Sequence, residues 1–435
     1  MSSLLPETMF PFLVAAFLSA LSLVLLVPAC TNVWWQMHAW RTPRLHASIT
    51  GTPSRGHPFT SFSAIVPFRH EAESVVRETV ARLLEQTHDA VEIVLSVGHD
   101  DPPAIAIANR LAGEWGDCVR VSVDTSPTKS KPRQLNAAAR MCTGEYVAVF
   151  DAESLTHPEL FAHADALLSS TRCEVLQCGV QLVNHRTAWF SLRNCLEYFF
   201  WFRSRLHLHA RHGFIPLGGN TVFIKRSLLD ELGGWDERAL TEDCELGVRL
   251  SSRGVSVAVA YDPRLVTREE TPDSVQALIR QRSRWNQGFL QVLSKGEWRR
   301  LPTRRQRLLA RYTLLQPFFQ ALTFAALLVA VVATVTAVLP LPVAMLTFLP
   351  LVPTVAMVIF ECAVLREFGR DLGLPIDVRD YVRLVLSTLP YVTVLGYAAL
   401  RALVREWGGR DDWEKTPHAG HHIVPVPGVG GVTAA

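Results

Sequence analysis

The sequence predicts an α/β domain built on a parallel sheet, with hydrophobic segments on both sides of it. Two observations carry this prediction. Short apolar stretches rich in β-formers alternate with helix-like stretches between residues 62 and 150, as in a parallel sheet with crossover helices. Residues 9–27 and 313–365 are almost free of charge and long enough to span a membrane, whereas residues 45–310 have the composition of a water-soluble protein.

The alternation also predicts where a ligand binds. Sheets of this kind bind ligands beyond the carboxyl ends of their strands. Asp151 and Glu153 directly follow the last strand-like stretch, so we expect them at that edge. The expected strands are 62–68, 91–97, 119–123 and 146–150, and the expected helices between them are 71–86, 102–113 and 133–142.

The first hydrophobic segment, 9–27, is interpreted as a membrane anchor rather than a signal peptide. Glu7 is the only charge before it, so the basic start of a signal peptide is missing, and no small-residue cleavage site follows. Arg41 and Arg44 lie just after it, together with three tryptophans. By the positive-inside rule, the domain that follows is expected in the cytoplasm.

The C-terminal hydrophobic region predicts two spans, 313–338 and 342–364, joined by a Leu-Pro-Leu-Pro stretch. A third apolar segment, 384–404, contains Pro390 and has arginines at both ends. Positive charge on both flanks does not favour a simple crossing, so this segment is expected to be a third span or a re-entrant or interfacial helix. The Gly/Pro/Val-rich end, 423–435, is expected to be disordered.

Composition excludes several other classes. The eight cysteines form no Cys-x-x-Cys pair and no metal-ligand spacing, which argues against a disulfide or zinc framework. A net charge of +3 is too small to indicate a nucleic-acid partner. The basic residues that precede the second hydrophobic region are expected to contact anionic lipid headgroups of a bilayer: Arg299, Arg300, Arg304, Arg305 and Arg307. The sequence predicts no oligomeric state.

Two groups of residues suggest chemistry without any comparison. Asp151 and Glu153 can hold Mg²⁺ or Mn²⁺ against a diphosphate, although a solvated strand end is the plainer alternative. Gln281, Arg284 and Trp285 share one helix face, where a guanidinium suits phosphate and an indole suits a sugar ring. The alternative is a basic amphipathic helix on the membrane with the tryptophan as its anchor.

Two further clusters need an explanation. Residues 239–250, "ALTEDCELGVRL", crowd three carboxylates into four positions. Residues 206–213, "LHLHARHG", carry three histidines, but no nearby carboxylate or cysteine completes a metal site. We therefore expect His207 and His209 to lie on an acceptor-side or interfacial surface.

A set of motifs in one order carries a family resemblance. The chain resembles the membrane-embedded inverting family-2 glycosyltransferases, including cellulose and hyaluronan synthases, over about residues 60–295. The resemblance implies a cytosolic GT-A (Rossmann-like) α/β domain inserted between transmembrane helices. The motifs are "VPFRHE" (66–71), "DAE" (151–153), "PLGGN" (216–220), "GGWD" (233–236), "TED" (241–243) and "QRSRW" (281–285), and "TKSKPRQLNAAA" before "GEYVAVFDAE" resembles the bacterial β-glycan synthase branch.

The resemblance also implies roles for individual residues. Asp243 would be the catalytic base, and the charges of Glu242 and Glu245 would raise its pKa, one of them pairing with Arg249 or Arg238. Two positions depart from the family pattern: "GHDDPP" leaves Asp101 as the alternative to Asp100, and Glu153 replaces an aspartate. The remaining roles are metal binding by Asp151 and Glu153, donor binding by Glu71, Asp100, Lys131, Asp151, Arg284, Trp413 and Thr416, and acceptor binding by Gly218, Gly219, Glu242, Gln281 and Trp285.

The tail motif "DDWEKTPH", 411–418, resembles the Trp-x-x-Thr gating motif by which hyaluronan synthases close over UDP. That role requires the tail to be cytoplasmic. The predicted regions are then an anchor (1–44), a glycosyltransferase domain (45–295), a basic interfacial segment (296–312), a membrane region (313–405) and a tail (406–435).

The resulting expectation is a multi-pass enzyme of the plasma membrane with a cytoplasmic catalytic domain. It transfers glucose or N-acetylglucosamine from a UDP-sugar to a growing β-glycan with inversion, uses Mg²⁺ or Mn²⁺, and couples to polymer export. One alternative is transfer of a single sugar to a lipid acceptor, as in ceramide glucosyltransferases. Another is a non-catalytic nucleotide sensor, which Asp243 disfavours because a sensor needs no base.

Overall fold

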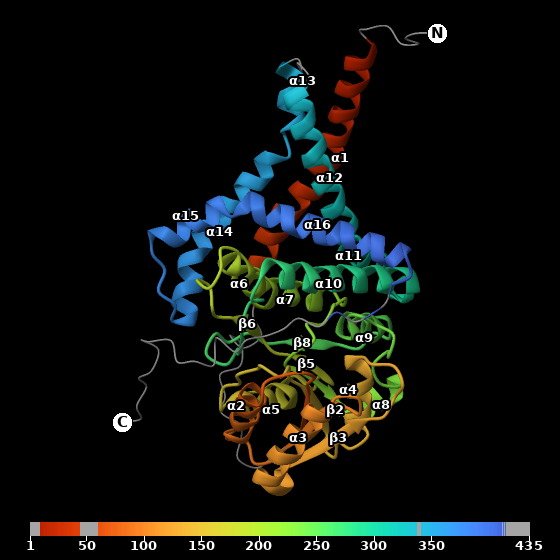
Figure 1. The fold of residues 1–435 in the computed structure, drawn as a ribbon, viewed down its shortest axis with the longest axis vertical. Helices are drawn as coiled ribbons and strands as arrows, with labels where there is room; N and C mark the ends of the chain where they lie inside the picture. Colours follow the sequence, from red (N-terminus) through yellow and green to blue (C-terminus); the bar gives the residue numbers. More distant parts are fainter. Residues whose placement is uncertain (1–8, 44–59, 337–340, 411, 413, 415–435) are drawn as a thin grey trace.

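The computed structural model describes residues 9–43, 60–336, 341–410, 412 and 414. An α/β domain occupies one end of the molecule, and the long helices α1, Met9–Trp40, and α12, Gln316–Thr336, rise from the other end (Figure 1). The N-terminal end of α1 lies far from the sheet, whereas its C-terminal end reaches the α/β domain (Figure 1).

The central sheet has seven strands in the order β3-β2-β1-β4-β7-β5-β8. The four predicted strands are confirmed and run parallel, with Ile65 of β1 aligned with Val94 of β2 and Val149 of β4. A separate small sheet pairs β6 with β9. The strands are β1 Phe62–Pro67, β2 Val91–Gly98, β3 Val119–Asp124, β4 Tyr146–Val149, β5 Val175–Gln177, β6 Val180–Leu182, β7 Val222–Lys225, β8 Val257–Val259 and β9 Thr267–Glu269.

The prediction of a purely parallel sheet is wrong beyond β4. Strand β7 pairs antiparallel with both β4 and β5, which makes the sheet mixed. Strand direction follows from the path of the connecting chain, and the apolar pattern of a short strand does not encode that path. Because β7 lies beside β4, the segment before β7, residues 217–221, comes close to the residues that follow β4.

Helices cover both faces of the sheet, which explains why β1 is buried along its whole length. Its alternate residues enter opposite cores: Ile65 packs in one cluster, and Ala64 and Val66 in the other. The three predicted helices in this half are confirmed. The domain helices are α2 Glu73–Leu84, α3 Pro102–Trp115, α4 Lys131–Ala139, α5 Leu160–Thr171, α6 Ser191–Phe200, η3 Trp201–Arg205, α7 Leu206–Arg211, α8 Arg226–Leu232, α9 Glu242–Ser252 and α10 Val275–Lys295, with a short η2 at Gly116–Cys118.

Within the described residues, α1 and α12 are long and apolar enough to cross a membrane. Two bent pairs raise the number of candidate spans to four if each pair is one span. These are α13 Leu341–Thr347 with α14 Leu351–Leu372, bent by 43°, and α15 Val378–Leu386 with α16 Thr388–Trp407, bent by 45°. The basic segment before α12 forms η4, Glu297–Arg300, and α11, Arg304–Leu314.

The predicted span over 342–364 falls on the bent pair α13 and α14, in which the helix breaks before Leu351. Pro350 lies at that break and has no N–H to continue the helical hydrogen bonds. The segment around 384–404 is also broken, and α16 runs across α1 and α12 rather than along them, directly over α10 (Figure 1).

Candidate active site

One cleft of the α/β domain brings together residues from several separate stretches of the chain. It lies between the ends of β4 and β7, the start of α9 and the middle of α10. Ten of the residues singled out in the sequence line this cleft: Lys131, Asp151, Glu153, Gly218, Gly219, Glu242, Asp243, Gln281, Arg284 and Trp285.

The floor of the cleft is the acidic end of strand β4, which forms an ion pair with the side chain of Lys131. Asp151 follows β4, and its Oδ1 lies 2.6 Å from the Nζ of Lys131, at the start of α4. The same ammonium lies 3.5 Å from Oε1 of Glu242. Burial lowers the pKa of Lys131, but the attraction of the two carboxylates outweighs burial and raises it overall. The floor therefore attracts positive charge.

The carboxylates fit the way in which Mg²⁺ and Mn²⁺ bind nucleotides. Among the described residues, no three His, Cys, Asp or Glu side chains have the geometry of a standing metal site. Asp151 and Glu153 nevertheless line one cleft. Magnesium is commonly held by one or two carboxylates together with substrate phosphates rather than by a complete protein cage. The donor set thus suits a cation that arrives with a diphosphate.

Asp243 lies in the first turn of α9, where the chain turns into the cleft. Its Oδ1 accepts a hydrogen bond of 2.8 Å from the backbone N–H of Cys244. Burial, with the neighbouring charge of Glu242 as the second cause, raises the pKa of Asp243 to about 7. The effect expected of Glu242 is therefore present, whereas Glu245 is not among the causes of this shift. Gly219 has φ 73°, and a Cβ there would lie 2.6 Å from Oδ2 of Asp243, so only glycine fits so close to this carboxylate.

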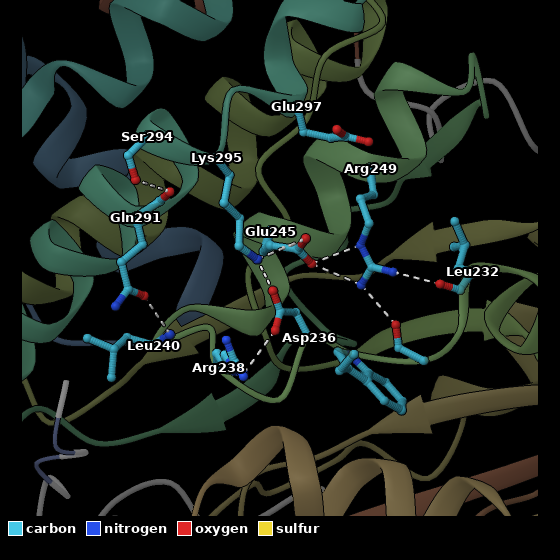
Figure 2. Close-up of polar contacts among 12 residues, drawn as sticks. Leu232, Asp236, Arg238, Leu240, Glu245, Arg249, Gln291, Ser294, Lys295 and Glu297 are labelled. Carbon is cyan, nitrogen blue, oxygen red and sulfur yellow. Dashed lines mark hydrogen bonds and ion pairs between the residues drawn. The ribbon is translucent and has the colours of Figure 1, made fainter.

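A network of polar contacts around Glu245 fixes the acidic segment in place (Figure 2). Glu245 is buried, and its carboxylate pairs with Arg249 at 2.9 Å and with Lys295 of α10 at 3.4 Å. Lys295 also pairs with Asp236, in the loop before α9. The predicted pairing with Arg249 is confirmed, whereas the backbone N–H of Arg238 donates to Asp236 instead. Helix α9, its preceding loop and the end of α10 are thereby tied together.

Helix α10 presents Gln281, Arg284 and Trp285 to the cleft, as their spacing predicts. The ring of Trp285 lies 6.3 Å from the ring of Tyr198, which also lines the cleft. This position favours the ligand-binding interpretation of Trp285 over an anchor in lipid. An aromatic pair at the mouth of a polar cleft is a surface on which a sugar ring can stack.

A second hollow adjoins the first, because Lys131 lines both. Asp100 lines it and forms ion pairs with Arg69 and, at 2.5 Å, with Lys129. The hydrogen bonds from Arg69 hold the pKa of Asp100 well below its usual range. Asp101 is buried and caps α3 instead, accepting from the N–H of Ala104 at 3.2 Å. The geometry thus favours Asp100 of the two aspartates as the ligand-facing residue.

Of the remaining predicted site residues, the structure describes one and not the other two. Glu71 follows β1 but lines neither hollow. Trp413 and Thr416 lie outside the described residues. Their neighbour Glu414 is held by Arg401 at 2.8 Å and by Arg405 at 3.1 Å.

The start of the tail also reaches α10, since the side chain of Gln287 donates to the carbonyl of Arg410 at 2.5 Å. Gln287 follows the "QRSRW" motif by half a helical turn. The described part of the tail therefore lies against the helix that lines the cleft.

The sequence analysis assigned no site role to Glu269, to Tyr198 or to Asn220, the last residue of the "PLGGN" motif, although all three line the cleft. Glu269 accepts a hydrogen bond from Ser154 at 3.1 Å and another from Asn220. Burial and the charges of Asp151 and Glu153 raise its pKa far above the ordinary value. The only signal was the acidic pair at 269–270 after a short β-branched stretch, which is too brief to indicate a strand end.

The interpretation of the histidine cluster as a surface is wrong. His207 and His209 are 5% and 0% exposed. His209 packs against Trp35 and Trp201, at ring distances of 5.4 and 5.8 Å, and burial lowers its pKa to about 3. The π-helical turn just before α7 shifts the face that these side chains present, and local spacing does not predict such a turn.

The fold and the cleft are those of a sugar-nucleotide transferase, and comparison with known proteins identifies the family. Residues 58–288 match the family model described as "Glycosyltransferase like family 2", which is more than half of the chain. The protein belongs to this family.

Several curated proteins are similar to it. A probable glycosyltransferase of Bacillus subtilis, YdaM, is 25% identical, over 54% of this chain and 56% of its own length. A beta-monoglucosyldiacylglycerol synthase of Trichormus variabilis is 26% identical, over 54% and 49%. The cellulose synthase catalytic subunit of Xanthomonas axonopodis pv. citri is 24% identical, over 62% and 36%. The chain spans about half the length of the first of these relatives.

Among solved structures, the mannosyltransferase PcManGT of Pyrobaculum calidifontis, in complex with GDP-Man and Mn²⁺, has a similar fold. The TM-score is 0.63 at 18% identity, over 90% of this chain and 99% of the other. The similarity confirms the predicted GT-A type of fold and extends over most of the chain.

Proposed function

We propose that the protein is an inverting hexosyltransferase that moves a sugar, glucose or N-acetylglucosamine, from a UDP-sugar to a glycan or glycolipid acceptor at the cytoplasmic face of the plasma membrane. The observation that carries this proposal is the convergence of a carboxylate of raised pKa, an acidic strand end and the Gln281, Arg284 and Trp285 face in one cleft. An inverting transfer needs these three parts: a base, a diphosphate site and an acceptor platform.

The proposed chemistry is a single displacement. The acceptor oxygen forms a bond to the anomeric carbon while the bond from that carbon to the diphosphate oxygen breaks. Asp243 takes the proton of the acceptor hydroxyl, and the nucleoside diphosphate leaves with the bonding electron pair. Arg284 and Lys131 offset the negative charge on the leaving group. A Mg²⁺ or Mn²⁺ ion held by Asp151 and Glu153 would supply further charge neutralisation there.

The second hollow is proposed to receive the nucleoside, because it adjoins the acidic floor through Lys131 and is lined by Asp100 and Lys129. Glu71 stays a proposed part of this donor site on the resemblance alone. Gly218 and Gly219 are proposed on the acceptor side, where the absence of side chains leaves room next to Asp243.

A growing β-glycan is the acceptor that the motifs predict, and a lipid acceptor is a second candidate that one observation favours. The candidate spans α1 and α12 are almost wholly apolar. Only 17% of the most apolar stretch of α1, and 22% of that of α12, is buried in the structure. Helices of this composition offer few polar side chains to line a passage for a polysaccharide. Cellulose synthase and glucolipid synthases both stand among the relatives.

Purified protein in detergent, incubated with a panel of UDP- and GDP-sugars and Mg²⁺ or Mn²⁺, tests the proposal. We expect nucleoside diphosphate release from one donor and its sugar in a product. Sizing that product separates a polymer from a single-sugar lipid. Nucleotide binding without release from any donor, with glycan and diacylglycerol acceptors present, would favour the non-catalytic sensor.

Trp285→Leu should impair transfer to the acceptor much more than hydrolysis of the donor by water. Leucine keeps the apolar character but lacks the flat ring on which a sugar stacks, a contact of about 1 kcal/mol that corresponds to roughly fivefold. Both rates are measured by nucleoside diphosphate release, with and without acceptor, and membrane association is measured by sedimentation. Equal loss of both rates, or protein shed from the membrane, would support the anchoring role instead.

The tail is predicted to lie on the cytoplasmic side, because Glu414 is clamped by Arg401 and Arg405 next to α10. A cysteine at Gly420, in a background that lacks the eight native cysteines, should resist a membrane-impermeant maleimide in intact cells and react after lysis. Deletion of 411–435 should leave inserted protein with little transfer, as expected if Trp413 and Thr416 close the donor site. Labelling in intact cells would place the tail outside and end this proposal.

A further inference from the structure

A buried tyrosine joins helix α16 to α6, a helix that contributes one residue to the cleft. Tyr391, in the first turn of α16, is 3% exposed, and its hydroxyl donates a hydrogen bond of 2.8 Å to Oε2 of Glu197. Glu197 lies on α6, one residue before Tyr198, whose ring lines the cleft. The helix that lies across the top of the α/β domain is therefore joined to a wall of the candidate active site (Figure 1).

The same carboxylate oxygen holds Arg282 of α10 in a charge-assisted hydrogen bond. The Arg282 side chain is only 14% exposed, and it forms an ion pair with Glu197. Its guanidinium carbon lies 4.5 Å from the ring centroid of Trp285. A continuous series of contacts thus runs from Tyr391 through Glu197 and Arg282 to Trp285, and it crosses three helices.

This series fixes a side chain that would otherwise be adjustable. A tryptophan at the edge of an open cleft can adopt several rotamers, and an ordered ring loses less freedom when it binds a ligand. The guanidinium is planar and suits an indole face, while its N–H groups stay on the carboxylate. Glu197 in turn is shared between Arg282 and Tyr391, so the orientation of the guanidinium depends on α16.

We propose that Arg282 is a positioning residue for the acceptor site: held by Glu197 and Tyr391, it fixes the ring of Trp285 against which the acceptor binds. The inference rests on the proposed transfer reaction. It gives α16 a role in acceptor binding in addition to its packing against α10. The contacts end at Trp285, so the donor site should be indifferent to them.

Kinetics of Arg282→Gln in the purified full-length protein test the inference. Glutamine keeps a hydrogen-bond donor for Glu197 but removes the cation from the indole. We expect the acceptor KM to rise about tenfold, as for loss of a desolvated cation–π contact, with the donor KM near the parental value. Glu197→Gln and Tyr391→Phe should raise the acceptor KM by smaller factors, because each removes one support of the guanidinium.

Two controls separate positioning from mere stability. Arg77→Gln removes a guanidinium that likewise pairs with a glutamate, Glu114, and lies 5.6 Å from the ring centroid of Trp115 outside the cleft, and both KM values should stay parental. The exchange Arg282→Glu with Glu197→Arg restores an ion pair between α10 and α6 but leaves no cation on Trp285. It should recover the thermal stability lost in Arg282→Glu alone, while the acceptor KM stays high.

An unchanged acceptor KM in Arg282→Gln, with an active parent, would overturn the inference and leave the proposed function intact. Equal rises of both KM values, or recovery of the acceptor KM in the charge exchange, would show a structural ion pair and also overturn it. A parent that transfers no sugar from any donor would overturn the proposed function and, with it, this inference.

Discussion

Asp243→Asn is expected to lower sugar transfer by about a thousandfold while nucleotide binding survives. The asparagine oxygen can still accept the hydrogen bond that the N–H of Cys244 donates in the parent. The amide cannot take a proton from an acceptor hydroxyl, so only the chemical step is lost. Transfer is measured by UDP release with acceptor, and affinity for UDP by calorimetry. Near-parental turnover in this variant would show that Asp243 is not the base.

The raised pKa of Asp243 gives this prediction a second measurement. A base must be deprotonated, so transfer should fall as the pH drops through about 7, the pKa of Asp243, rather than near 4 as for an ordinary aspartate. Asp230→Asn, which changes an exposed carboxylate on α8, serves as the control and should keep the parental profile. If the activity of Asp243→Asn still fell over the same pH range, the loss of activity at low pH would be due to the titration of another group.

The sequence predicts the first half of the sheet well because helices cover both of its faces. Strands such as β1 are then buried along their whole length, and their mostly apolar sequences stand out between amphipathic helices. The later strands are only three or four residues long, and their direction depends on long connections. The break before Leu351 and the π-helical turn before α7 likewise arise from packing and not from local periodicity.

The candidate site is predictable to the extent that its motifs have a fixed spacing. Gln281, Arg284 and Trp285 lie on one face because the helical repeat dictates it. Glu269 and Asn220 meet the same cleft only through the pairing of β9 with β6 and of β7 with β4, which no local pattern reports. The structure distinguishes the two adjacent aspartates as candidate ligand-binding residues. Asp101 caps the N-terminus of α3, whereas Asp100 lines the second hollow.

Asp151→Ala is expected to weaken UDP binding in the presence of Mn²⁺ by about tenfold or more, because the proposed metal loses a carboxylate ligand. Without metal, the variant should bind UDP at least as well as the parent, since Lys131 loses its 2.6 Å partner and can meet the diphosphate. Calorimetry with and without Mn²⁺ measures both effects.

Glu159→Ala removes an exposed carboxylate that precedes α5 on the same connection and serves as the matched control, with parental affinities expected. The metal-binding role of Asp151 requires both results: weaker UDP binding with Mn²⁺, and UDP binding that is not weakened without it. General damage to the cleft would weaken both measurements equally. Equal affinity of Asp151→Ala and the parent for UDP in Mn²⁺ would remove Asp151 from the proposed metal site and leave it only the ion pair with Lys131.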